Sequence, residues 1–102
     1  SDDEFTAKTK FISKLGLSLH ACGATSHRIE KHLNKLTRML GINGDFLIAP
    51  TSITCVYWRD DPSNQTNIIK RVHPGGGDLG RLEQLDSLIE QFQSNKLNFH
   101  EM

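Results

Sequence analysis

The chain has 102 residues, and 12 Lys and Arg balance 12 Asp and Glu, so its formal net charge is zero. Hydrophobic residues make up 36% and charged residues 24%, which is typical of a soluble globular domain with one core. Nucleic-acid-binding domains usually carry a clear basic excess, so nucleic acid is not an expected partner. Apolar runs are short, as in Phe46 to Ala49, whereas a membrane-spanning helix needs about 20 apolar residues. We therefore expect a single soluble domain over residues 1–102, with its core between about 4 and 93.

Two helices are predicted at the start of the chain. Residues 4–22 carry apolar side chains at the spacing of a helix with one buried face. Gly23 ends this segment, and Thr25 or Ser26 offers an N-cap for a second helix that runs to about Leu40 and is closed by Gly41. Because the connection between them is short, the two helices should form an antiparallel αα-hairpin.

Three strands are predicted next, because β-branched and aromatic residues gather in Phe46–Ala49, Ser52–Arg59 and Asn67–His73. Asn43-Gly44-Asp45 before them has the composition of a turn. Pro50 marks a bend between the first two strands, and Asp60 to Gln65 reads as a hairpin loop. Short loops between successive strands predict an antiparallel meander.

A third helix is predicted after Pro74-Gly75-Gly76-Gly77, with Asp78 as its N-cap. Its expected buried side consists of Leu79, Leu82, Leu85, Leu88, Ile89 and Phe92. The glycines are not expected to bind phosphate, because no Lys-Ser or Lys-Thr pair follows and Asp78 would occupy the place of the anion. The predicted fold class is α+β, in the order α-α-β-β-β-α.

Polar residues are densest around the turn between the first two helices. Arg28 can bind a carboxylate through two parallel hydrogen bonds, and Glu30 could bind an ammonium group. This chemistry suits a zwitterion or a dicarboxylate. The alternative is that both residues form structural ion pairs that fix the turn against the sheet.

Catalysis and metal binding receive little support from the residues. Cys22 with His20 or His27 could form a thiolate–imidazole pair across the turn, but Cys22 also continues the apolar stripe of the first helix. Cys55 is the second cysteine, and both are expected as buried thiols. His27 and His32 lie five residues apart, on different faces of a helix, so no metal site is predicted. No cofactor is predicted either.

Charge is distributed unevenly between two of the predicted helices. The second carries a basic stripe made of Arg28, Lys31, Lys35 and Arg38. The third is acidic, with Asp78, Glu83, Asp86 and Glu90. Such faces usually point to solvent, although a basic stripe on a tethered domain could also contact anionic lipid headgroups.

Several short motifs occur in an order that resembles a known family. They are Gly23-Ala24-Thr25-Ser26-His27-Arg28-Ile29-Glu30, Leu40-Gly41, Ala49-Pro50-Thr51-Ser52-Ile53, Arg71-Val72 and Asp78-Leu79-Gly80-Arg81-Leu82. Together they resemble the soluble N-terminal domain of the threonine/serine exporter family, over roughly residues 11–92. Thr25 stands where many members of that family have proline. Both residues suit the start of a helix.

The resemblance implies a domain that precedes a bundle of transmembrane helices, or that pairs with them across two chains. It implies a position on the cytoplasmic face of the plasma (inner) membrane, in a protein of which this segment is a part. The expected partners are the transmembrane portion or a partner membrane subunit. A second copy of the chain and a small amino acid or dicarboxylate are further candidates. A hydrolase-like role is also associated with this family.

The sequence therefore predicts a cytoplasmic domain of an exporter of threonine, serine or a related small acid, acting in assembly, gating or substrate sensing. The predicted ligand-binding residues are Arg28, Glu30, Thr51 and Arg71. One alternative is a small hydrolase-like enzyme, with His27 and Cys22 as its catalytic candidates. The other is a structural module that pairs subunits.

Overall fold

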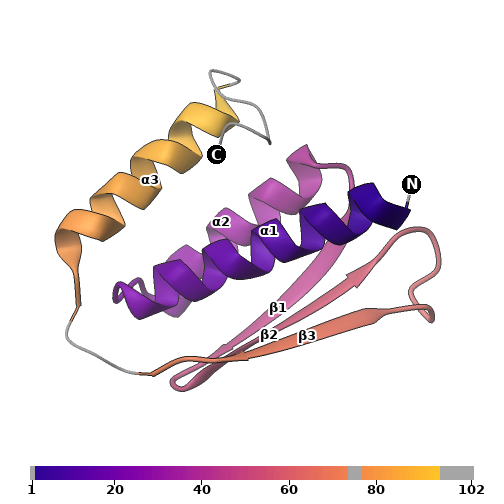
Figure 1. The fold of residues 1–102 in the computed structure, drawn as a ribbon, viewed down its shortest axis with the longest axis horizontal. Helices are drawn as coiled ribbons and strands as arrows, with labels where there is room; N and C mark the ends of the chain where they lie inside the picture. Colours follow the sequence, from indigo (N-terminus) through magenta and orange to yellow (C-terminus); the bar gives the residue numbers. More distant parts are fainter. Residues whose placement is uncertain (1, 74–76, 95–102) are drawn as a thin grey trace.

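The computed structural model describes residues 2–73 and 77–94 of the chain (Figure 1). Its elements, in chain order, are α1 (Asp2–Ala21), α2 (Ser26–Met39), β1 (Asn43–Ala49), β2 (Ser52–Trp58), β3 (Thr66–Arg71) and α3 (Leu79–Gln93). The three strands form an antiparallel sheet in the order β1-β2-β3. The predicted α+β class and the order α-α-β-β-β-α are confirmed.

The elements form three layers, shown in Figure 1. The antiparallel pair α1 and α2 covers one face of the sheet, and α3 lies on the side of that pair away from the sheet. The rings of Phe11 on α1 and Phe92 on α3 lie 6.3 Å apart between centroids. The buried apolar residues of all three layers form one core: Ile12, Leu15, Leu19, Cys22, Ile29, Leu33, Leu36, Phe46, Ile53, Cys55, Tyr57, Val72, Leu82, Leu85, Ile89 and Phe92.

The sheet alternates between its two faces, as a half-covered sheet should. In β2, Ile53, Cys55 and Tyr57 are buried beneath the helices, while the residues between them are less buried. Leu47 and Ile69 lie opposite Thr54 in the register and are 68% and 70% exposed. Among the described residues, nothing covers the face to which this row belongs (Figure 1).

The helix ends follow the sequence predictions. Gly23 and Gly41 have φ angles of 93° and 73°, the left-handed conformation that glycine adopts without steric cost after a helix. The hydroxyl of Thr25 accepts a hydrogen bond from the backbone N–H of Arg28 at 3.2 Å. The carboxylate of Asp78 likewise accepts from the N–H of Arg81 at 3.0 Å. Both predicted N-caps are therefore confirmed.

The turn predicted at Asn43-Gly44-Asp45 is wrong, because these residues begin β1 and pair with Trp58, Tyr57 and Val56 of β2. Gly44 has a packing role instead. A Cβ atom built there would lie 2.9 Å from Thr37 of α2 and 3.2 Å from Tyr57. The glycine thus lets the start of β1 approach α2 closely. The chain turns before the strand begins, at Gly41, two residues ahead of Asn43.

Two smaller predictions are also corrected. Leu79 and Leu88 were expected on the buried side of α3, but they are 73% and 36% exposed, because α3 turns a narrower face to the other helices. The third strand ends at Arg71 rather than at His73, which is exposed as a loop residue. Part of the predicted glycine turn, residues 74–76, lies outside the described residues, and so does His100, which is expected from the sequence to face solvent.

A polar network lies inside the core, between α1 and β2. The hydroxyls of Ser13 and Tyr57 are 2.8 Å apart, and both side chains are buried. Burial raises the pKa of the Tyr57 phenol and of the Cys55 thiol, while the side chains of Ser13 and Tyr57 act in the opposite direction on the pKa of Cys55. These groups satisfy one another, so the network fixes how α1 sits on the sheet.

Candidate functional site

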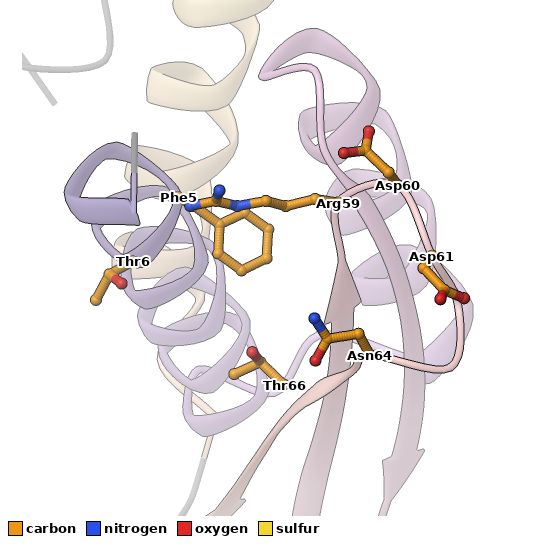
Figure 2. A pocket seen from close by; sticks show the side chains of 7 residues that line it. All are labelled: Phe5, Thr6, Arg59, Asp60, Asp61, Asn64 and Thr66. Carbon is orange, nitrogen blue, oxygen red and sulfur yellow. The ribbon is translucent and has the colours of Figure 1, made fainter.

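A hollow of about 490 Å³ lies at the end of the domain where α1 begins (Figure 2). Its walls include Phe5 from α1, and Arg59, Asp60, Asp61, Asn64 and Thr66 from the connection after β2 and the start of β3. A second hollow of about 240 Å³ shares Phe5, Arg59 and Asp60 with the first. The sequence predictions treated 60–65 only as a hairpin loop. The signal that could have identified this hollow was a run of Arg, Asp and Asp at the end of a strand.

Segments of four of the five motifs gather at the opposite end of the domain, where α1 ends and α2 begins (Figure 1). Leu40-Gly41 instead follows α2, and Gly41 borders the second hollow. We call this the motif end and define it as Gly23-Ala24, Pro50-Thr51, Arg71–His73 and Asp78-Leu79. Backbone hydrogen bonds join its segments: the N–H of Asp78 donates to the carbonyl of Cys22 at 3.2 Å, and that of Val72 donates to Thr51 at 2.8 Å. Segments that are distant in the sequence are therefore joined in two pairs at this end of the domain.

Thr51 and Arg71 lie close together at the motif end. Ser52 pairs with Arg71 in the sheet register, and Thr51 stands in the adjacent β1–β2 turn. Both side chains are exposed. Glu30 lies half-buried on α2 and makes no hydrogen bond or ion pair within the described part of the chain.

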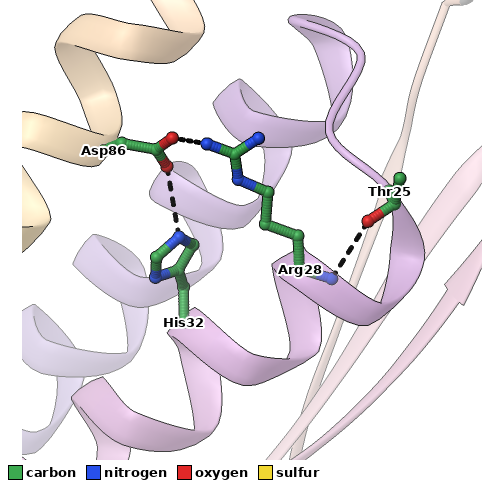
Figure 3. A network of polar contacts seen from close by, with 4 residues as sticks. All are labelled: Thr25, Arg28, His32 and Asp86. Atoms are coloured by element: carbon green, nitrogen blue, oxygen red, sulfur yellow. Dashed lines mark hydrogen bonds and ion pairs between the residues drawn. The ribbon is translucent and has the colours of Figure 1, made fainter.

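Arg28 contacts the acidic helix rather than the sheet. Its guanidinium forms an ion pair with the carboxylate of Asp86 on α3, as Figure 3 shows. The other carboxylate oxygen of Asp86 lies 3.2 Å from Nε2 of His32. Asp86 thus receives two donors from α2 and links the two oppositely charged helices. We call these three residues the α2–α3 clasp.

The electrostatics of His32 follow from this position. Burial lowers its pKa below the ordinary 6.5, and the positive charges of Arg28, Lys31 and Lys35 lower it further, while Glu90 acts in the opposite direction. The contact with Asp86 does not require a charged ring, because a neutral imidazole can donate from Nε2. His32 therefore acts in the clasp as a neutral donor at neutral pH.

The catalytic candidates do not meet. Cys22 is buried in the core, as expected from the apolar stripe, and His27 is exposed on α2. Nε2 of His20 lies 2.7 Å from the carbonyl of Ala49 and so ties α1 to the end of β1. Among the described residues, no hydrogen bond joins the thiol of Cys22 to either histidine. Both cysteines are free and buried.

In residues 2–73 and 77–94, no group of three or more His, Cys, Asp and Glu side chains is arranged to hold a metal ion. Over the same residues, no helix is both long and apolar enough to cross a membrane.

Comparison with known proteins gives a family. Residues 10–102 match a family model described as "Putative threonine/serine exporter". The chain belongs to this exporter family. An uncharacterized protein of Schizosaccharomyces pombe is 29% identical over 94 residues, which cover 92% of this chain and 12% of that protein. The chain thus spans about an eighth of the length of this relative. No solved structure matches the chain.

Membership of the family confirms the resemblance drawn from the motifs. The motif end contains residues of four of the five motifs on which that resemblance depends, and it lies within the matched region. Family membership relates the chain to threonine and serine export.

Proposed function

We propose that the chain is a cytoplasmic domain of an exporter of threonine, serine or a related small acid. In this proposal it acts on the transmembrane portion, or on a partner membrane subunit, in assembly, gating or substrate sensing. The observation that carries the proposal is the motif end. Segments of four motifs that resemble an exporter family, separated by up to about half the chain, lie together there, and two backbone hydrogen bonds join them in pairs.

The construction of the motif end leaves side chains available for a partner. The hydrogen bonds that join its segments use backbone groups, and so do not occupy the exposed side chains of Thr51 and Arg71. Arg28, on α2, keeps 44% of its side-chain surface exposed, although it pairs with Asp86 on α3. A surface held rigidly by its backbone can bind a partner or a small anion at little entropic cost.

The position of the domain can be tested by thiol labelling. Cys22 and Cys55 are buried, so the folded domain itself should give little background. Ser63 is exposed, and Ser63→Cys would introduce an accessible thiol. The experiment uses a complete transporter whose cysteines outside this domain are replaced, with and without Ser63→Cys, and a membrane-impermeant maleimide. Labelling that requires permeabilised cells supports the cytoplasmic position, and equal labelling of intact cells contradicts it.

The role of the motif end can be tested by export. In cells that express the complete transporter, we expect Thr51→Ala with Arg71→Ala to lower threonine efflux at least several-fold without lowering the amount of transporter in the membrane. Lys10→Ala, an exposed position on α1 outside the motif end, is the matched control and should export normally. Normal efflux by the double variant would contradict the proposed role of this surface.

A further inference from the structure

The hollow at the start of α1 has the chemistry of a ligand site, and it lies away from the motif end. Its volume of about 490 Å³ falls within the range of small-molecule pockets in proteins. Its walls combine one guanidinium, two carboxylates, an amide, hydroxyls and one aromatic ring. Such a mixture of opposite charges is complementary to a ligand that itself carries both charges.

Arg59 is held in place in the wall of this hollow. Its Cζ atom lies 4.9 Å from the centroid of the Phe5 ring, a cation–π contact, as Figure 2 shows. Its backbone carbonyl accepts a hydrogen bond from the side-chain amide of Asn43 at 2.5 Å. Stacking uses the flat face of a guanidinium, and its in-plane N–H groups can then bind a carboxylate in bidentate fashion. Arg59 borders both hollows, so a ligand in either can reach it.

The acidic side of the hollow comes from the residues that follow. Asp60 borders both hollows together with Arg59. Asp61 accepts a hydrogen bond from the backbone N–H of Ser63 at 3.0 Å, and this bond lowers the pKa of its carboxyl. Asp61 therefore shapes the loop and stays ionised, and Asp60 is the carboxylate that borders both hollows.

Two neutral polar side chains complete the walls. Figure 2 shows Asn64 and Thr66 directed toward the Phe5 ring, across the hollow from α1. An amide and a hydroxyl in this position can hydrogen bond with a hydroxyl group of a ligand.

We propose that this hollow binds the zwitterion of a small hydroxylated α-amino acid. Arg59 binds the α-carboxylate, Asp60 binds the α-ammonium group, and Asn64 and Thr66 contact the side-chain hydroxyl. The choice of threonine or serine rests on the proposed function, whereas the requirement for both charges rests on the hollow alone. The site thereby gives substrate sensing a location that differs from the residues predicted at the motif end.

Titration of the 102-residue chain, followed by amide chemical shifts in NMR, tests this site. L-Threonine and L-serine at up to about 10 mM should shift the amides of 59–66 and of the first turns of α1, as for ligands of millimolar affinity. Threonine methyl ester lacks the carboxylate, and N-acetylthreonine lacks the ammonium group. Each should bind about tenfold more weakly or worse, because each lacks one of the two charged groups that the site binds.

Matched variants separate the site from the fold. Arg59→Lys keeps the charge but loses the planar fork, and Asp60→Asn keeps the shape but loses the charge, so each should weaken threonine binding about tenfold. Arg81→Ala and Glu83→Gln alter exposed residues of α3 and should bind threonine normally. No shift at about 10 mM threonine, equal binding of the ester and the N-acetyl derivative, or shifts confined to the motif end would each overturn the assignment. Labelling and export do not depend on this titration, so its failure would leave the proposed function standing.

Discussion

The sheet with α1 and α2 is built differently from α3. Beneath α1 and α2, the fully buried Ile53 and Leu33 pack together with the hydrogen-bonded pair of Ser13 and Tyr57. α3 is held from one side only, by a row of apolar side chains and by the partly exposed clasp at Asp86. Layers that bury less of their surface open at lower free energy. The domain therefore combines a rigid two-layer body with a third layer that should detach more readily.

The largest effect should come from removing a side chain in the two-layer body. Ile53 and Ile89 are both fully buried, one in β2 and one in α3, and so form a matched pair. Ile53→Ala should lower the free energy of unfolding by about 3–4 kcal/mol, because the surrounding layers cannot close the cavity. Ile89→Ala should lower it by less, because α3 can shift. Equal losses in urea unfolding would contradict the proposed difference between the layers.

Removing part of the buried polar network should lower the free energy of unfolding by a smaller amount. Tyr57→Phe removes the phenol and leaves the buried hydroxyl of Ser13 without this partner, which should cost about 1–2 kcal/mol. Ser13→Ala with Tyr57→Phe removes both members. The double variant should therefore lose less than the sum of the two single variants in the same unfolding experiment. Strict additivity would show that the pair is not coupled.

Loss of the α2–α3 clasp should destabilise α3 locally. Asp86→Ala removes the acceptor for Arg28 and His32, and partly exposed ion pairs contribute about 0.5–1 kcal/mol. We expect amide hydrogen exchange to accelerate over residues 79–93 and to change little in the sheet. Glu83→Gln is the control, since it alters an exposed charge on the same helix. Uniform acceleration across the chain would mean that α3 opens only with the whole domain.

The smallest effect should be a dependence on pH. Because the pKa of His32 is lowered in the folded domain, the unfolded chain takes up a proton first as the pH falls below 6.5. The contribution of His32 thus makes the domain less stable as the pH falls from 6.5 toward the lower folded pKa. His32→Gln should reduce this acid-side decline in melting temperature, and His27→Gln, at an exposed position, should not. An unchanged decline in His32→Gln would show that the protonation of His32 is not its cause.

Local patterns were sufficient to predict the elements of the fold. Helical spacing, the caps at Thr25 and Asp78 and the glycines at 23 and 41 act over a few residues, so the sequence shows them directly. The turn predicted at Gly44 was wrong because glycine occurs both in tight turns and where a strand lies very close to a helix. Only the position of Thr37 on α2 distinguishes these two cases. The exposure of Leu79 likewise depends on how α3 docks, which its own spacing cannot reveal.

The candidate site was predictable only in part. The motifs identified the residues of the family, and the fold brings their segments to one end. The partner of Arg28 could not be read from the sequence, because Asp86 lies 58 positions away and any of four acidic residues on the third predicted helix could have met it. The hollow at Arg59 needs the start of α1 and a loop between two strands to meet, and no local pattern encodes that contact.

The order of the strands in the sheet has a consequence for how the chain folds. β1, β2 and β3 neighbour each other in space in the same order as in sequence, and α1 and α2 are joined by a short turn. Most partners therefore meet after closing small loops, and chains with such local contacts fold quickly. The packing of α3 against α2 closes a longer loop, because all three strands lie between these two helices in the chain. We expect a rapid phase that forms the hairpin and meander, followed by a slower one in which α3 docks and completes the motif end.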